Sequence, residues 1–365
     1  MKILVYDVAA EDGGGLFVLK NFYEEVIKDS EKHPNIEWIF LTSYKILESK
    51  KNVHTINYAW IKKSWIHRLY FEEIKIQKIL RELDVDVIIS LQNTIIKHCK
   101  IRQYVYLHQS LQYCPQKFSL LNRTERGLAI RQKFICGMYK NGLKKATHIY
   151  VQTEWIKDET IKWISCKKDK ISVIPVSIEK IPEQYDKKEL KTNVFFYPAR
   201  AEIYKNHDVI LKACKILEKR GVYNYRVLFT MEKTDNLYAQ HISNECEKLP
   251  IEFIGKVEYK DIWNYYKKAV LLFPSYLETC GLPMLEARYM ETIVLASDLP
   301  FAHEALDGYK NAYFFQYSDE NKLADIMEEL IKGQKKYIYV EKQEMKTNKS
   351  SLLKSMMNDI LNKDR

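Results

Sequence analysis

The sequence lacks the long apolar run that a membrane-spanning helix requires. Such a helix needs about 20 consecutive apolar residues, and no stretch of these 365 residues reaches that length. No leader segment is expected before the first strand, because Lys2 leads directly into it. The two absences predict a protein that is soluble or bound peripherally to a membrane.

Cysteine is scarce and scattered. The seven cysteines form no Cys-x-x-Cys pair and no zinc-like spacing with histidine, so we expect a reducing, cytoplasmic compartment rather than a disulfide framework. An Asp-x-Asp pair at a strand end is missing as well, since Asp84-Val85-Asp86 lies at the start of an expected strand. The sequence therefore predicts neither a metal ion nor a cofactor.

Acidic residues are fewer than basic ones, and the formal net charge is +10. A basic chain is compatible with a nucleic-acid partner. No nucleic-acid-binding motif accompanies the charge, however, and the joint abundance of Lys, Ile, Asn and Tyr indicates a general compositional bias. We predict no nucleic-acid partner.

One basic and aromatic segment, residues 58–71, differs from the rest of the chain. It places Trp60, Trp65 and Phe71 beside several Lys and Arg side chains, a combination that suits the surface of an anionic membrane. A lipid-linked acceptor would explain such a contact. The same pattern fits a loop and a helix packed on the first domain, and both interpretations stay open.

Apolar strands alternate with helical segments along the chain, which indicates an α/β fold with parallel sheets. The length allows two domains with separate cores. We expect the division after Ile174-Pro175-Val176, because residues 179–193 are polar and charged, as is typical of a linker. The expected strands are Lys2–Tyr6, Trp38–Thr42, Val85–Ser90, Tyr104–Leu107, His148–Gln152, Ser172–Pro175, Val194–Tyr197, Arg226–Thr230, Ile251–Ile254, Val270–Pro274 and Ile293–Ser297.

The most informative segment is residues 273–304. An apolar run at Val270–Phe273 predicts a buried strand, and Pro283 sits where a helix can begin. Glu278 and Glu286 stand eight positions apart around the glycine turn between strand and helix. A helix start favours a phosphate, and carboxylates accept hydrogen bonds from sugar hydroxyls. The segment suggests a site for a phosphorylated sugar, and two surface glutamates are the alternative.

A second group of residues follows another strand. Arg200 and Lys205 flank the turn between a strand that ends at Tyr197 and a helix that continues through Leu217. Two cations beside a helix start can neutralise a diphosphate leaving group, a task that a metal ion otherwise performs. Taken alone, an Arg and a Lys five residues apart are more often solvated charges.

Glycine is also scarce, with 11 in the chain, yet three are consecutive at 13–15, between a short strand and a helical pattern from Leu16 to Val26. Glycine lets a backbone approach a ligand closely, but without the full Gly-x-Gly-x-x-Gly the signal is weak, and a plain turn is the alternative. His108 follows the expected strand Tyr104–Leu107, at the strand end where ligands bind in open α/β sheets. A lone histidine is more often structural.

Residues 273–304 resemble the signature of family 4 glycosyltransferases, which belong to the glycosyl transferases group 1. The shared features are the Glu-x7-Glu pair, the Gly-Leu-Pro turn and the following Ser-Asp-Leu-Pro. Thr279 and Cys280 depart from the family's usual Glu-Gly-Phe-Gly beside the donor sugar, which leaves the donor open. The resemblance implies that Glu278 contacts the transferred sugar and that Glu286 contacts the nucleotide ribose.

The resemblance extends to the other segments. The cationic turn resembles the family's Gly-Arg…Lys-Gly/Asn turn, with Ala199 in place of the usual glycine. By the same resemblance the glycine segment faces the donor phosphates, and the histidine lines the cleft near the donor sugar. The predicted catalytic residues are Glu278, His108, Arg200 and Lys205. The predicted donor-binding residues are Gly14, Gly15, Arg200, Lys205, Gly255, Lys256, Val257, Glu278, Cys280, Gly281, Leu282 and Glu286, with Gly255-Lys256-Val257 beside the base.

The fold that the resemblance implies is GT-B, in which two Rossmann-like, doubly wound domains face each other across a cleft. We place the acceptor-side domain at residues 1–178 and the nucleotide-sugar-binding domain at residues 190–340. The last helix, within residues 345–365, is expected to pack back on the first domain.

We predict a retaining, metal-independent glycosyltransferase that moves a sugar from a nucleotide diphosphate donor to a hydroxyl of a glycan or polyprenyl-linked acceptor. The resemblance implies a role in bacterial surface polysaccharide assembly, of capsule, O-antigen or exopolysaccharide. Two other classes remain open. One is a nucleotide-sugar epimerase, which would need no acceptor, or a phosphorylase, which would need inorganic phosphate. The other is a non-catalytic sugar-nucleotide-binding subunit.

Overall fold

The computed structural model describes residues 1–11, 13–176, 190–339 and 351–362, which fall into two compact units. The first unit consists of Met1–Gln109, Gln132–Pro175 and the C-terminal helix α13, Leu352–Asn362. The second consists of Ser110–Arg131, Val176 and residues 190–339. The domain range predicted as 1–178 thus contains one segment, 110–131, that packs in the second unit.

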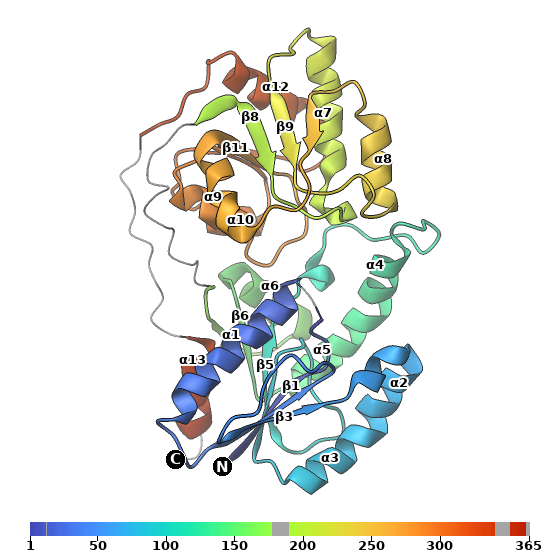
Figure 1. Ribbon diagram of the computed structural model, residues 1–365, viewed down its shortest axis with the longest axis vertical. Coiled ribbons are helices and arrows are strands. Elements are labelled where there is room, and N and C mark those ends of the chain that lie inside the picture. The colour runs from blue at the N-terminus through green and yellow to red at the C-terminus, as the bar shows by residue number, and fades with distance from the viewer. Residues whose placement is uncertain (12, 177–189, 340–350, 363–365) are drawn as a thin grey trace. The chain divides into compact units, whose positions relative to one another are not determined.

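The first unit is built on a seven-stranded parallel sheet with the strand order β3-β2-β1-β4-β5-β6-β7. Figure 1 labels β1, β3, β5 and β6 among these strands. Its central strands are almost wholly buried, as expected for a parallel sheet covered on both faces. The strands are β1 Lys2–Asp7, β2 Glu37–Thr42, β3 Val53–Asn57, β4 Val87–Ser90, β5 Arg102–Leu107, β6 His148–Val151 and β7 Ile171–Val173.

Alternate residues of β1 enter two separate apolar cores, because successive strand side chains point to opposite faces. Ile3 and Val5 pack in a core with α1 (Gly13–Ser30) and α13. Leu4 and Tyr6 pack in a core with the segment from η1 to α3. That segment comprises η1 Ala59–Lys63, α2 Trp65–Tyr70, η2 Phe71–Lys75 and α3 Ile76–Leu83; the unit also contains α5 Cys136–Lys145, α6 Glu154–Ile164 and η5 Lys168–Lys170.

Helix α13 is held on the first unit by apolar and polar contacts. Leu353, Met356 and Ile360 are buried in the same core as α1. The Tyr150 hydroxyl on β6 donates a hydrogen bond to Asp359 Oδ2 at 2.5 Å. The C-terminal helix α13 therefore packs beside the N-terminal helix α1 and shares its apolar core.

The second unit has a six-stranded parallel sheet with the order β10-β9-β8-β11-β12-β13. Helices α7, α8 and α12 contact one another in series, and α9 and α10 contact β11. The strands are β8 Lys191–Tyr197, β9 Arg226–Phe229, β10 Ile251–Phe253, β11 Ala269–Phe273, β12 Val294–Ser297 and β13 Ala312–Phe315. The helices are η3 Leu111–Tyr113, α4 Arg126–Ile130, η7 Ile203–Lys205, α7 His207–Lys219, α8 Leu237–Glu245, α9 Tyr259–Lys268, α10 Leu282–Tyr289, α11 Pro300–Ala305 and α12 Glu320–Ile331; η4 Arg131–Ile135 begins at the edge of this unit.

The two parallel sheets confirm the predicted α/β class, and the structure adds strands β3 and β13 to those expected. The linker predicted at 179–193 lies mostly outside the described residues. Its last three residues, Lys191–Asn193, instead begin β8, because backbone pairing does not require apolar side chains. Within the described residues, no helix has both the length and the apolar character needed to cross a membrane.

Strand order reverses beside β8, since β9 and β10 extend the second sheet to one side and β11, β12 and β13 extend it to the other. Ligands of open α/β sheets bind outside the carboxyl ends of the strands at such a reversal. A ligand site is therefore expected at the loops that follow β8 and β11. Those loops carry the predicted Arg200, Lys205 and Glu278.

Candidate active site

Lys205 and Glu278 form an ion pair between the loops that follow β8 and β11. Lys205 Nζ lies 2.5 Å from Glu278 Oε1, although the two residues are 73 positions apart in the chain. Their side chains are only 19% and 14% exposed, so the two charges attract each other with little screening by water. The structure therefore brings together one predicted cation and one predicted carboxylate.

The two loops are joined by hydrogen bonds around this pair. Asn206 adopts a left-handed conformation with φ of 60°, and its Nδ2 donates to the carbonyl oxygens of Pro274 at 3.1 Å and Tyr317 at 2.7 Å. The Ser275 hydroxyl donates to the carbonyl of Tyr204 at 3.1 Å. These bonds connect the chain after β8, β11 and β13, and they fix the backbone that carries Lys205.

Arg200 lies on the same loop as Lys205 and is exposed. Burial raises the pKa of the neighbouring Tyr204 above its ordinary value, as do the charges of Glu202 and Glu278, whereas Arg200 acts in the opposite direction. The guanidinium is thus close enough to influence the Tyr204 hydroxyl. The predicted cations share one loop, and Lys205 is the one that contacts Glu278.

Glu286 accepts hydrogen bonds from two tyrosines of α9. It is the fifth residue of α10 rather than the first, and it is 4% exposed. Tyr266 donates its hydroxyl to Glu286 Oε2 at 2.8 Å, and Tyr259 donates to Oε1 at 3.2 Å. Burial, followed by the charge of Glu286, raises the pKa of Tyr266 well above its ordinary value, so that hydroxyl remains a donor. Hydroxyl donors offset the cost of burying the carboxylate.

Gly281 makes the sharp turn between Glu278 and α10. Its φ of +61° is a conformation that other residues rarely adopt, and a Cβ at this position would clash with the end of Met284 and lie 3.5 Å from the Phe273 ring. Pro283 follows in the first turn of α10, as predicted. Cys280 is buried, and burial, with the nearby Glu278 charge second, raises the pKa of its thiol to about 12. A protonated thiol is a poor nucleophile, so Cys280 shapes the site rather than reacting.

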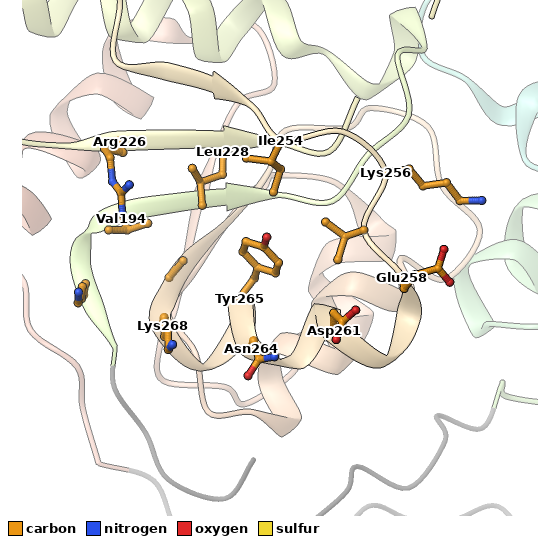
Figure 2. A pocket seen from close by; sticks show the side chains of 13 residues that line it. Val194, Arg226, Leu228, Ile254, Lys256, Glu258, Asp261, Asn264, Tyr265 and Lys268 are labelled. Atoms are coloured by element: carbon orange, nitrogen blue, oxygen red, sulfur yellow. The ribbon is translucent and has the colours of Figure 1, made fainter. Parts of the chain in front are cut away.

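The predicted base-binding turn, Gly255-Lys256-Val257, borders a different space. Lys256 and Val257 line a cavity of about 710 Å³ between α9 and strands β8 and β9, into which Tyr265 also projects (Figure 2). Gly255 has a φ of +70°, and a Cβ there would lie 2.5 Å from Glu232 Oε1. Neither member of the ion pair lines this cavity, and the role of the turn beside the base stays a prediction.

His108 and Gly15 meet in the first unit. His108 Nε2 donates to the Leu91 carbonyl at 2.7 Å, and its backbone N–H donates to Asn93 Oδ1 at 2.8 Å. Because a carbonyl only accepts and burial lowers the pKa of His108, the neutral ring has its proton on Nε2 and an acceptor at Nδ1. A Cβ on Gly15 would lie 3.9 Å from His108 Cε1, whereas nothing lies within 4 Å of one on Gly14. The geometry permits the histidine to accept a hydrogen bond.

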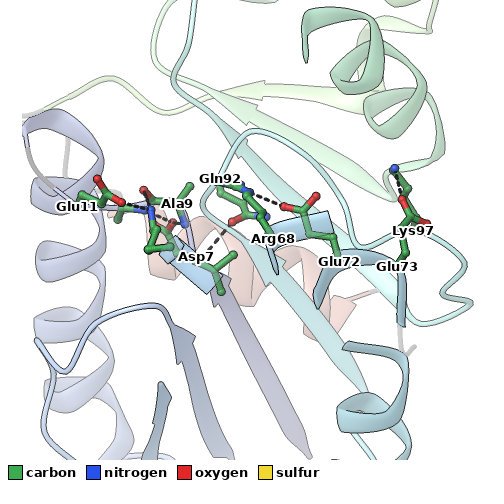
Figure 3. Close-up of polar contacts among 11 residues, drawn as sticks. Asp7, Ala9, Glu11, Arg68, Glu72, Glu73, Gln92 and Lys97 are labelled. Carbon is green, nitrogen blue, oxygen red and sulfur yellow. Dashed lines mark hydrogen bonds and ion pairs between the residues drawn. The ribbon is translucent and has the colours of Figure 1, made fainter. Parts of the chain in front are cut away.

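The glycines at 13–15 form the first turn of α1, not a turn ahead of it. Helix starts tolerate glycine, because the first backbone N–H groups have no partner within the helix. The loop before them is held by Asp7, which accepts hydrogen bonds from the backbone of Ala9 at 3.2 Å and Ala10 at 3.0 Å (Figure 3). Burial raises the pKa of Asp7 to about 6. Sequence reasoning missed Asp7, whose signal would have been a carboxylate at the end of an apolar strand.

Lys62 also holds this loop. Its Nζ lies 2.5 Å from Glu11 Oε1 and donates to the Ala9 carbonyl at 3.1 Å (Figure 3). Lys62 belongs to the basic and aromatic segment 58–71, for which a membrane contact and packing on the first domain were both open. The structure gives it a partner within the protein, as it does Arg68, whose Nε lies 2.8 Å from Glu72 Oε1.

Residues 110–131 contribute to the second unit close to the site loops. The charge of Arg131 acts on Tyr204, and Cys114 and Glu125 act on Tyr276. No motif in this segment pointed to such a role, because its side chains follow no clear period. The structure thus adds a segment from the first half of the chain to the unit that carries Lys205 and Glu278.

Residues 177–347 match the family model described as glycosyl transferases group 1. The match confirms the resemblance to glycosyl transferases group 1 over this part of the chain, and it supports the prediction of a transferase enzyme. It covers the site loops after β8 and β11, with Arg200, Lys205, Glu278 and Glu286.

Two curated relatives match part of the chain. The O-antigen chain mannosyltransferase RfbU of Salmonella typhimurium strain LT2 is 27% identical over 182 residues, which are 48% of this chain and 49% of the relative. An uncharacterized 41.2 kDa protein in the cps region of Klebsiella pneumoniae is 26% identical over 152 residues, which are 41% of this chain and 40% of the relative. The chain spans about half the length of the curated relatives it matches.

Solved structures resemble the whole described fold. Sucrose-phosphate synthase from Thermosynechococcus elongatus has a TM-score of 0.63 at 15% identity and covers 91% of this chain and 90% of its own. WaaG, a glycosyltransferase involved in lipopolysaccharide biosynthesis, has a TM-score of 0.61 at 14% identity, with coverages of 91% and 90%. At these identities the likeness shows the fold, two Rossmann-like domains of the GT-B type.

Proposed function

We propose that this chain is a family 4 glycosyltransferase that transfers a sugar, with retention of configuration and without a metal ion, from a nucleoside diphosphate sugar to an acceptor hydroxyl. The observation that carries the proposal is the Lys205–Glu278 pair, which joins two loops at the strand-order reversal within a segment that matches group 1 glycosyltransferases. Retention of configuration rests on the resemblance to family 4.

The bond that breaks joins the transferred sugar to the diphosphate. Lys205 suits the diphosphate side of this bond, and Glu278 suits the sugar side. The leaving diphosphate gains negative charge in the transition state, and a fixed cation there lowers the barrier. Lys205 supplies that cation, and exposed Arg200 on the same loop supplies a second. Glu278 accepts hydrogen bonds from hydroxyls of the transferred sugar, which replace its contact with Lys205. Two cations in this role support metal independence.

The relatives suggest the substrate class. RfbU is a mannosyltransferase of the O-antigen chain, and the second relative lies in a cps region. A structural neighbour, Anabaena HepE, was solved in complex with UDP. We propose a nucleoside diphosphate sugar as donor, a glycan or polyprenyl-linked acceptor, and a role in surface polysaccharide assembly at the cytoplasmic side of the membrane.

Helix α2 supports a peripheral membrane contact. The side chains of Trp65, Ile66 and Leu69 are 73%, 61% and 44% exposed, and Lys63 beside them is exposed. Phe71, in contrast, is fully buried. Packing on the first domain therefore describes Phe71, which belongs to the core. A membrane contact is proposed only for the apolar side chains that α2 presents to solvent. A lipid-linked acceptor would meet this helix at the membrane surface.

The test is a transfer assay with a panel of UDP-, GDP-, ADP- and dTDP-sugars. A donor that raises the melting temperature is selected and supplied with a polyprenyl-linked or glycan acceptor, with and without EDTA. We expect an α-linked product from an α-linked donor, at an unchanged rate in EDTA. An altered sugar without acceptor would indicate an epimerase, dependence on inorganic phosphate a phosphorylase, and binding without turnover a non-catalytic subunit. Loss of activity in EDTA that Mn²⁺ restores would contradict metal independence alone.

A further inference from the structure

The two tyrosines that cover Glu286 differ in how firmly they are held. Both lie on α9, two turns apart and hence on the same face of the helix. Tyr266 is completely buried, and its ring packs against Phe196 at a centroid distance of 5.7 Å. Tyr259 is 43% exposed and is the first residue of α9.

Their hydrogen bonds show the same asymmetry. The buried Tyr266 makes the shorter bond, 2.8 Å, to Oε2, and the exposed Tyr259 makes the longer one, 3.2 Å, to Oε1. Tyr259 follows the turn at Gly255, where a positive φ and the close approach to Glu232 allow only glycine without strain. The Tyr259 hydroxyl, which donates to Glu286 Oε1, can therefore be replaced by another donor at lower cost than the Tyr266 hydroxyl.

We propose that Tyr266 is a positioning residue that holds Glu286 Oε2, and that Tyr259 is an exchangeable cover whose hydroxyl leaves Oε1 to the ribose of the nucleotide. The inference rests on the proposed function, in which Glu286 contacts that ribose. A carboxylate that is 4% exposed cannot accept hydrogen bonds from a ribose until its cover moves. Once Tyr259 moves aside, Oε1 accepts from the ribose hydroxyls while Tyr266 keeps the carboxylate from rotating.

The two hydroxyls therefore have opposite effects on affinity. Loss of the Tyr266 hydroxyl removes the buried hydrogen bond to Oε2 and with it a restraint on the orientation of the carboxylate, which weakens binding. Loss of the Tyr259 hydroxyl removes a competitor and raises the fraction of protein that is ready to bind, so affinity stays equal or increases a few-fold. A merely structural pair of tyrosines would affect binding in the same direction.

The experiment is calorimetry on the full chain with UDP, GDP and ADP, followed by the 2′,3′-dideoxy form of whichever binds best. Tyr266→Phe should weaken the ribonucleotide about tenfold, as expected for one hydrogen bond to a charged group, and leave the dideoxy form unchanged. Tyr259→Phe should bind the ribonucleotide at least as tightly as the wild type. Tyr223→Phe is the matched control, because it removes a hydroxyl that donates to the Glu218 carbonyl at 3.2 Å without touching Glu286, and it should change neither affinity.

Each outcome decides a different point. Equal weakening of both nucleotide forms by Tyr266→Phe would assign it a structural role and overturn the proposal. Weakening by Tyr259→Phe would make Tyr259 a permanent ligand and overturn the exchange, and this half-exposed position allows that test even if Tyr266→Phe does not fold. If nucleotides bind but Glu286→Gln does not weaken them, this inference fails while donor binding stands. If none of the three binds the wild type, the proposed function fails as well.

Discussion

Lys205 and Glu278 each compensate the charge of the other. The pair is largely buried, so removal of one member leaves an uncompensated charge in a place with little water. In the proposed mechanism Lys205 has a second task, because it stabilises the charge of the departing diphosphate. A change at Lys205 therefore tests the mechanism more directly than a change at the exposed Arg200.

We predict that Lys205→Ala lowers turnover by about two to three orders of magnitude, because it removes a preorganised charge that acts in the transition state. The measurement is kcat with the selected donor, with circular dichroism to confirm folding. The matched control is Lys215→Ala on α7, which breaks a pair with Glu245 at 2.6 Å whose side chains are 41% and 48% exposed. That control should keep its turnover. Near-normal turnover of a folded Lys205→Ala protein would refute the assignment.

The sequence could predict Lys205 and Glu278 because each follows an apolar strand and precedes a helix, and parallel strands place such residues at one sheet edge. It could not predict the partners of Glu286. Tyr259 and Tyr266 belong to an aromatic-rich helix, and only its packing decides which hydroxyl meets the carboxylate. The contact of Lys62 with Glu11 could not be predicted for a similar reason, because the two residues lie far apart in the chain.

At the scale of elements, Asn206 acts as the junction of three strand ends. Its amide nitrogen donates to carbonyls of the chain after β11 and after β13, while its own backbone ends the short helix η7 at Lys205. Aspartate has the same shape and a similar tolerance of a left-handed backbone. It cannot donate, so its carboxylate would face two carbonyl oxygens.

We predict that Asn206→Asp lowers the free energy of unfolding of the second unit by about 2 to 4 kcal/mol and reduces turnover, because Lys205 loses its fixed backbone. Denaturant unfolding followed by circular dichroism measures the first effect, and the transfer assay measures the second. Asn193→Asp is the matched control, since Asn193 donates at 3.1 Å to the carbonyl of Asn224 at an exposed position, and it should cost much less. Equal stability losses in the two variants would show that Asn206 is not a junction.

Element boundaries were predictable only where side-chain pattern and backbone pairing agree. Strand β1 was expected at Lys2–Tyr6 and ends at Asp7, since an apolar run marks it clearly. Strand β13, Ala312–Phe315, was missed because it is a short edge strand with mostly half-buried side chains. The assignment of residues 110–131 to the second unit could not be read from any local pattern, because it depends on contacts with residues far along the chain.

At the scale of the whole molecule, the proposed membrane contact concerns where the enzyme works. The apolar side chains of α2 would add a term that salt does not remove, and nearby cations would add about 1 kcal/mol each, which salt screens. Lys62 and Arg68 are unsuitable positions for substitutions that test this contact. Both have partners within the protein, so replacing them would disturb the loop before α1 and α2 itself.

We predict that the protein sediments with vesicles of anionic phospholipid and that binding weakens, but persists, as salt rises. Trp65→Ser, Ile66→Ser and Leu69→Ser combined should lower vesicle affinity by at least 100-fold, since each inserted side chain contributes about 1.5 to 3 kcal/mol, while Lys63→Ser should lower it only at low salt. Tyr223→Ser with Leu237→Ser is the matched control, because these side chains are 65% and 55% exposed in the second unit, and it should bind like the wild type. A folded, active wild type that ignores anionic vesicles at low salt would exclude the membrane contact and point to a soluble glycan acceptor.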